Sequence, residues 1–227
     1  MRRAMLLIMG FGGMVLMSLV WVVQVQNCGL EPKVYVPRNT FYPRTVMGTE
    51  LLAVEATAYS GPFWEDGSDE LVTGVAALVV ENRGGLLVAG GAVILELESD
   101  YLVFEISFLP PGGKVLVLEK DRKGYESFSA VTCYGWTKEA HTENIGLISV
   151  EAMGLTGLVL SNHTGCTVPS LQVHYKNFDP ERGIFLGGIA YCVTQEDLMP
   201  REVRAVEPAN FTAGQSRIVS VLQEMGR

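Results

Sequence analysis

Few side chains in this sequence could do acid–base chemistry, and those few stand apart. His163 and His174 each occur alone within β-type sequence. The chain has no G-x-S-x-G elbow, no H-E-x-x-H pair and no glycine-rich phosphate loop after a strand. We therefore expect hydrogen-bonded or exposed histidines of the ordinary kind, and a protein that is not an enzyme.

The densest group of carboxylates is "WEDGSDE", Trp64 to Glu70, which holds four of them. Carboxylates could supply the 6–8 oxygen ligands that Ca²⁺ takes. Their spacing differs from the D-x-[DN]-x-[DN]-G pattern of the twelve-residue calcium loop. We expect a solvated acidic turn here, and we predict no metal and no cofactor.

The four cysteines are Cys28, Cys133, Cys166 and Cys192. An even count outside a membrane allows two disulfides, although the spacing is not that of a small stapled domain. No two cysteines have the C-x₂₋₄-C spacing of a zinc site. Of the pairings that remain open, we prefer Cys166 with Cys192.

An apolar stretch near the N-terminus bears on location. Met5 to Val25 is 21 residues without a charge, and a helix of that length at about 1.5 Å per residue spans a bilayer of roughly 30 Å. Arg2 and Arg3 precede it, so the positive-inside bias puts the N-terminus in the cytoplasm. We predict a single-pass signal anchor with the C-terminal domains outside the cytoplasm; a cleaved signal peptide is the alternative.

The composition points to a folded, acidic exported part. Of 227 residues, 48% are hydrophobic and 19% charged, which is ordinary for a globular chain. Beyond the apolar stretch, 25 acidic side chains stand against 15 basic ones. Phosphate binding needs clustered Lys and Arg, so nucleic acid is not an expected partner.

An internal repeat organises the exported part. "GVAALVVENRGGLLV", Gly74 to Val88, is followed 80 residues later by "GLTGLVLSNHTGCTV", Gly154 to Val168. Both runs end in an Asn, Asn82 and Asn162, a residue that closes strands by bonding nearby backbone and tolerating positive φ. After an insertion of nine residues in the second copy, the offset becomes 89. We infer a duplicated structure.

Within each copy, apolar residues alternate or run in short blocks between Gly, Pro and Asn turns. This pattern predicts antiparallel strands in a sandwich or barrel. The predicted fold class is therefore all-β: an N-terminal transmembrane helix followed by two tandem immunoglobulin-like antiparallel β-sandwiches. The predicted parts are the cytoplasmic tip and anchor at 1–26, a Pro-containing stalk at 27–48, the first sandwich at 49–138, a linker at 139–145 and the second sandwich at 146–227.

The order of these strands resembles bacterial immunoglobulin-like modules of the FxLYD and CARDB kind. An apolar strand ends in Asn, and a strand with Tyr or Leu then leads into Leu-x-Pro. "HYKNFD" and "LELESD" only approximate the Phe-x-Leu-Tyr-Asp motif. The resemblance implies a module of exported or membrane-anchored proteins.

We therefore expect a membrane-anchored extracytoplasmic binding or assembly module, whose partner is another envelope or surface protein. The alternatives are an exported carbohydrate- or ligand-binding protein, or a hydrolase with an unrecognised site. The insertion within "NFDPERGIFLGG" is the candidate recognition loop, unless it forms a hairpin that folds its aromatics back onto its own sheet. Its candidate partner-binding residues are Phe178, Asp179, Glu181, Arg182, Ile184 and Phe185.

Overall fold

Thirteen β-strands make up the regular structure of this computed structural model, which describes residues 36–40, 52–65, 70–125, 132–140 and 148–224. Within these ranges there is no helix, and so none long and apolar enough to cross a membrane. The prediction of an all-β protein is thus confirmed for this part of the chain. The predicted anchor lies outside the described residues, as do most of the predicted stalk and linker.

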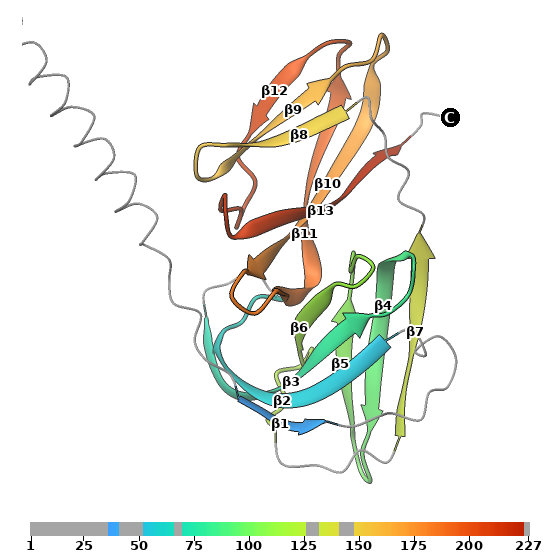
Figure 1. Cartoon of the computed structure of the whole chain (residues 1–227), viewed down its shortest axis with the longest axis vertical. Coiled ribbons are helices and arrows are strands. Elements are labelled where there is room, and N and C mark those ends of the chain that lie inside the picture. The colour runs from blue at the N-terminus through green and yellow to red at the C-terminus, as the bar shows by residue number, and fades with distance from the viewer. Residues whose placement is uncertain (1–35, 41–51, 66–69, 126–131, 141–147, 225–227) are drawn as a thin grey trace, which may run out of the picture. The chain divides into compact units, whose positions relative to one another are not determined.

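Seven strands form one sheet, to which both predicted sandwiches contribute (Figure 1). Its order is β1-β2-β3-β6-β11-β10-β13. The bounds are β1 Val36–Thr40, β2 Leu52–Pro62, β3 Leu71–Asn82, β6 Lys114–Leu118, β10 Val168–Asp179, β11 Ile184–Leu198 and β13 Ser216–Glu224. The residues of β2 and β3 alternate between buried and more exposed in part of their length, which is why these segments form strands with one face on a core. In β6, by contrast, Val115 to Leu118 are all buried, because this strand has a core on each face.

Two smaller sheets cover the seven-stranded sheet. The sheet β5-β4-β7 covers the part made of residues 36–140, here called the N-terminal half, and β12-β9-β8 covers residues 148–224, the C-terminal half. Their bounds are β4 Leu87–Glu96, β5 Tyr101–Ile106, β7 Thr132–Ala140, β8 Ile148–Met153, β9 Gly157–Asn162 and β12 Val203–Val206. Each half has a core between its two sheets, with residues such as Leu78 and Phe104 in one and Leu160 and Val173 in the other.

The two halves join along a parallel pair of strands. Phe185 of β11 is paired with Val115 of β6, and Leu186 with Leu116. The other strand pairs are antiparallel. Residues 34–227 accordingly form one compact unit.

The repeated asparagines, Asn82 and Asn162, donate equivalent hydrogen bonds to backbone carbonyls in each half. Asn82 Nδ2 donates to the carbonyls of Leu86 and Leu109, both at 2.9 Å. Asn162 Nδ2 donates to Cys166 O at 2.9 Å and Leu198 O at 3.0 Å, which are the same partners shifted by 80 and 89 positions. Both asparagines are buried, so each ties the end of one strand to two other segments.

Positions with positive φ repeat as well. Gly74 and Gly154 both have positive φ, +67° and +63°. Phe108 and Asp197, at the offset of 89, share a rarer feature, because both are non-glycine residues with φ near +50° (48° and 50°). The copies therefore share backbone geometry where their side chains differ.

Candidate functional site at the bulge of strand β11

The second copy differs from the first at an irregularity in β11. Tyr175 of β10 is paired with Tyr191, and Asn177 with Leu186. Lys176 alone therefore lies opposite residues 187–190, here called the β11 bulge. Bulges of this kind redirect side chains and bend a strand.

Lys176 fills the space that the bulge opens. Its side chain is fully buried, and its ammonium donates to the carbonyl oxygens of Gly187, at 2.9 Å, and Gly188. Burial lowers the pKa of Lys176 to about 7, and the negative charge of Glu65 offsets only part of that effect. A charged residue is thus buried at a position where the alternation of β10 predicts the face away from the apolar core residues.

Glu65, which follows β2, reaches the same bulge from the N-terminal half. Its Oε1 accepts hydrogen bonds from the amides of Leu118 and Gly188, both at 2.9 Å. Its Oε2 is buried and has no hydrogen-bond partner among the described residues. Burial raises the pKa of Glu65, while the two amides and Lys176 act in the opposite direction.

Further contacts fasten the bulge to the N-terminal half. The amide of Ser107 donates to Gly188 O at 2.9 Å, and the amide of Ala190 donates to Ser107 Oγ at 2.8 Å. The hydroxyl of Tyr191 donates to Trp64 O at 3.1 Å. The joint between the halves is therefore hydrogen-bonded from several segments.

His174 lies near this joint, with its ring stacked on Phe108 at a centroid distance of 3.7 Å. Its side chain is largely buried, and Nδ1 has no hydrogen-bond partner among the described residues. Burial lowers the pKa of His174. The ring therefore packs between the two halves.

Gly188 lies close to strands β5 and β6 of the N-terminal half. A Cβ atom at this position would lie 2.0 Å from the carbonyl oxygen of Glu105 and 2.7 Å from Cγ1 of Val117. Real Cβ atoms do not come so close to backbone oxygen, so only glycine fits without movement of β5 or β6.

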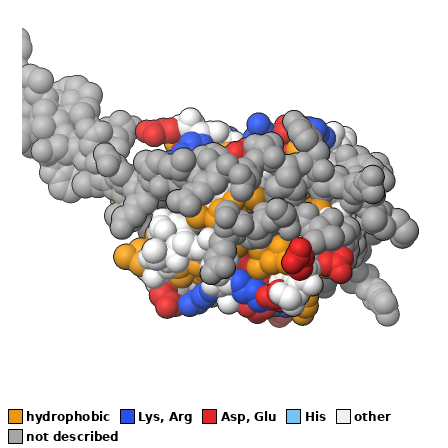
Figure 2. Space-filling model, turned by 90° about the horizontal axis from the view of Figure 1, so that it is seen from below, with side chains coloured by type: hydrophobic (Ala, Val, Ile, Leu, Met, Phe, Trp, Pro, Cys, Tyr) orange, Lys and Arg blue, Asp and Glu red, His pale blue; other side chains and the backbone are white. Residues whose placement is uncertain are grey.

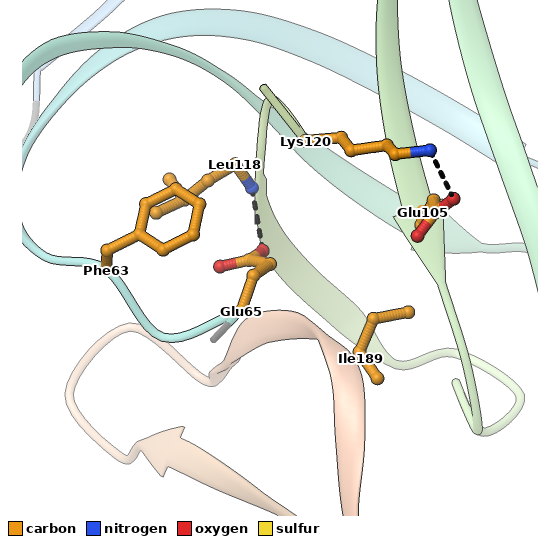
Figure 3. Close-up of a pocket in the computed structure, with 6 residues that line it drawn as sticks. All are labelled: Phe63, Glu65, Glu105, Leu118, Lys120 and Ile189. Atoms are coloured by element: carbon orange, nitrogen blue, oxygen red, sulfur yellow. Dashed lines mark hydrogen bonds and ion pairs between the residues drawn. The ribbon is translucent and has the colours of Figure 1, made fainter. Parts of the chain in front are cut away.

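A small hollow opens beside the bulge (Figure 3). It has a volume of about 170 Å³, and its lining residues are Phe63, Glu65, Glu105, Leu118, Lys120 and Ile189. Lys120 Nζ lies 3.6 Å from Glu105 Oε1, and this ion pair closes one side. Ligand sites for drug-sized molecules are usually about 300–1,000 Å³, so this hollow suits at most a single side chain or a few water molecules.

The candidate recognition hairpin between β10 and β11 turns its apolar residues inward. Ile184 and Phe185 are buried in cores of the N-terminal half, and Phe178 packs against one of them. This burial fits the alternative of a hairpin folded back onto the protein. The side chains form a bridge between the halves.

The polar residues of the same hairpin differ in exposure. Asp179 is buried, and its Oδ1 accepts from the amides of Glu181 and Arg182 at 3.0 and 3.2 Å, which shapes the turn. Arg182 Nε lies 3.6 Å from Asp179 Oδ2. Glu181 is exposed. Recognition through Glu181 and Arg182 stays a prediction.

The preferred disulfide between Cys166 and Cys192 is absent; both residues are exposed free thiols. The strand register explains why. Val168 is paired with Leu198, which puts Cys166 at that end of β11, whereas Cys192 is paired with His174. Six residues of strand correspond to about 20 Å, far beyond the roughly 7 Å that a disulfide permits between Cα atoms.

The remaining sequence candidates bring no cluster together. Most of the acidic segment at 64–70 lies outside the described residues, and within the described ranges no three His, Cys, Asp or Glu side chains are grouped as metal ligands. His163 Nε2 makes a 2.9 Å hydrogen bond with Ser149 Oγ at the surface. Sequence reasoning did not find Lys176 and Glu65, because each looks like an ordinary surface charge.

Comparison of the chain with protein-family models, with curated proteins and with solved structures found no match.

Proposed function

We propose that this chain is a membrane-anchored extracytoplasmic module that binds another envelope protein, and that its C-terminal half carries the binding surface. The uncharged segment 5–25 supplies the anchor. The joint at the β11 bulge holds the C-terminal half at a fixed position on the N-terminal half. The sequence resemblance to modules of exported and anchored proteins is consistent with this role.

The observation that carries the proposal is the distribution of exposed apolar side chains. Nine large hydrophobic side chains are exposed in the described part of the chain, and seven belong to the C-terminal half. These seven are Met153, Leu155, Ile189, Met199, Val203, Ile218 and Leu222. Single exposed apolar residues are normal, but a concentration in one half favours an interaction surface there.

Strand β13 adds a second feature of the same half. Within the described ranges it pairs only with β10, so one of its edges is open. An open edge can accept an extended segment of a partner. By contrast, the guanidinium of Arg204 on β12 donates to the carbonyls of Glu196 at 2.8 Å and Asp197 at 3.0 Å, which closes the gap between β12 and the end of β11.

On the face that Figure 2 shows, acidic and basic side chains are interspersed with apolar ones. No single-sign field of the kind that attracts polyanions is visible there. Together with the excess of acidic over basic side chains beyond the apolar stretch, 25 against 15, this arrangement favours a protein partner over nucleic acid.

Site-specific photo-crosslinking in intact cells of the native host tests the proposal. A photoreactive amino acid at Val203, which is 67% exposed, should give at least tenfold more adduct than the same group at Leu71, which is 63% exposed. The two positions are matched in exposure and side-chain type, so the difference reports location. Protease added outside the cells should remove the adduct.

Equal adduct at both positions, or adduct at Leu71 alone, would contradict binding through the C-terminal half. In cells whose envelope has been made permeable to protease, adduct that survives digestion would contradict export.

A further inference from the structure

Two buried ionisable groups, one from each half, bind the β11 bulge at Gly187 and Gly188. Lys176 binds the carbonyls of Gly187 and Gly188, and Glu65 accepts the amide of Gly188. Among the described residues no ion pair within 4.0 Å joins these two groups. Each charged group is therefore removed from water without an opposite charge in contact. Burial of a charge in this way costs free energy, and the cost disappears when the group becomes neutral.

We propose that Lys176 and Glu65 form a proton-operated latch, which holds the β11 bulge against the N-terminal half least firmly near neutral pH and more firmly when either group is neutral. This inference does not depend on the proposed function.

The direction follows from linkage. Burial raises the pKa of Glu65 in the folded protein, so the latched state binds a proton at a higher pH than the opened state does. The latch therefore tightens as pH falls toward the ordinary pKa of a glutamate. Burial lowers the pKa of Lys176 to about 7, so the latched state releases a proton at a lower pH than the opened state does. The latch therefore tightens as pH rises above about 7. The two effects together give a minimum between them.

The neighbouring elements carry further titratable and charged groups. On β2, the Tyr59 hydroxyl interacts with Glu65, and burial raises its pKa far above the range concerned. Arg217 of β13 is paired with Lys176 in the ladder, and its guanidinium stacks on Phe178. Arg182 and Asp179 form an ion pair in the β10–β11 turn, and Lys120 and Glu105 form another beside the hollow.

His174 is a neighbouring group whose titration opposes the tightening that Glu65 gives at acid pH. Burial lowers the pKa of His174. Its contribution to the stability of the folded state is therefore present at a pH above the ordinary pKa of histidine and is lost as pH falls. His174→Phe preserves an aromatic ring against Phe108 and removes this titration. It serves as the reference background.

Hydrogen exchange of the full chain in detergent tests the latch. The reporters are the amides of Gly188 and Ala190, whose acceptors are Glu65 Oε1 and Ser107 Oγ. In the His174→Phe background we expect protection factors, corrected for intrinsic exchange, to pass through a minimum near neutral pH. One linked proton corresponds to about a tenfold rise per pH unit on either side.

Two single variants separate the two limbs. Glu65→Gln should abolish the rise on the acid side and keep the alkaline rise, whereas Lys176→Met should do the reverse. A profile that is flat in the reference background, or an acid rise that survives Glu65→Gln, overturns the proposal. If Lys176→Met does not fold, the Glu65→Gln comparison decides alone.

Discussion

Gly188→Ala is expected to destabilise the protein by about 3 kcal/mol or more, at the upper end of what overpacking costs. The added Cβ would meet the Glu105 carbonyl oxygen at 2.0 Å and Val117 Cγ1 at 2.7 Å. The first of these atoms is backbone in β5, so relief requires the small sheet of the N-terminal half to move away from β11. Chemical unfolding of the variant and the parent, at the same pH and ionic strength, measures the difference.

The matched control is Gly90→Ala in β4, where an added Cβ meets no atom within 4 Å. We expect a change within about 0.5 kcal/mol there. A Gly188→Ala protein within 1 kcal/mol of the parent would show that the halves do not approach as closely as described.

Removal of either repeated asparagine side chain is expected to cost about 2–4 kcal/mol. Asn162→Ala leaves the carbonyls of Cys166, Leu198 and Met199 without this donor, and Asn82→Ala does the same to Leu86 and Leu109. A buried polar group left unsatisfied costs about 1–3 kcal/mol. Thermal or chemical unfolding of the two variants should show losses of similar size, because Leu86 and Leu109 correspond to Cys166 and Leu198.

Asn162→Asp distinguishes the donor from the acceptor role. The carboxylate can still accept the hydrogen bond from the Thr164 amide, which Asn162 Oδ1 accepts at 2.9 Å. It cannot donate to the three carbonyls, so it should be at least as destabilising as Asn162→Ala. Full stability of Asn162→Asp would mean that the carbonyl contacts contribute little.

The sequence was sufficient for features that depend on local pattern. Segments in which apolar and polar residues alternate, such as those that begin at Val93, Tyr101 and Ser170, lie in strands, because alternation reflects a strand with one buried face. The repeat also located Asn82 and Asn162 correctly, since a duplicated fold preserves strand ends. Positive φ was not needed at either, because both lie within strands and bond to the backbone of other segments.

The joint between the halves could not be predicted in the same way. The parallel pairing of β6 with β11 joins segments from different copies, and no periodicity within either copy encodes it. Glu65 and Lys176 become neighbours only through that pairing. Likewise, the pairing of Cys166 with Cys192 is excluded only by the strand register, which composition and spacing do not supply.

The two repeated halves form one unit, held together at the β11 bulge. Native-state hydrogen exchange at increasing denaturant tests it most directly, with core amides such as Val80 in one half and Leu160 in the other, which are both fully buried. If the halves form one unit, both amides exchange through the same global opening, with one free energy and one denaturant dependence. A C-terminal half that opens at a distinctly lower free energy than the N-terminal half would contradict it.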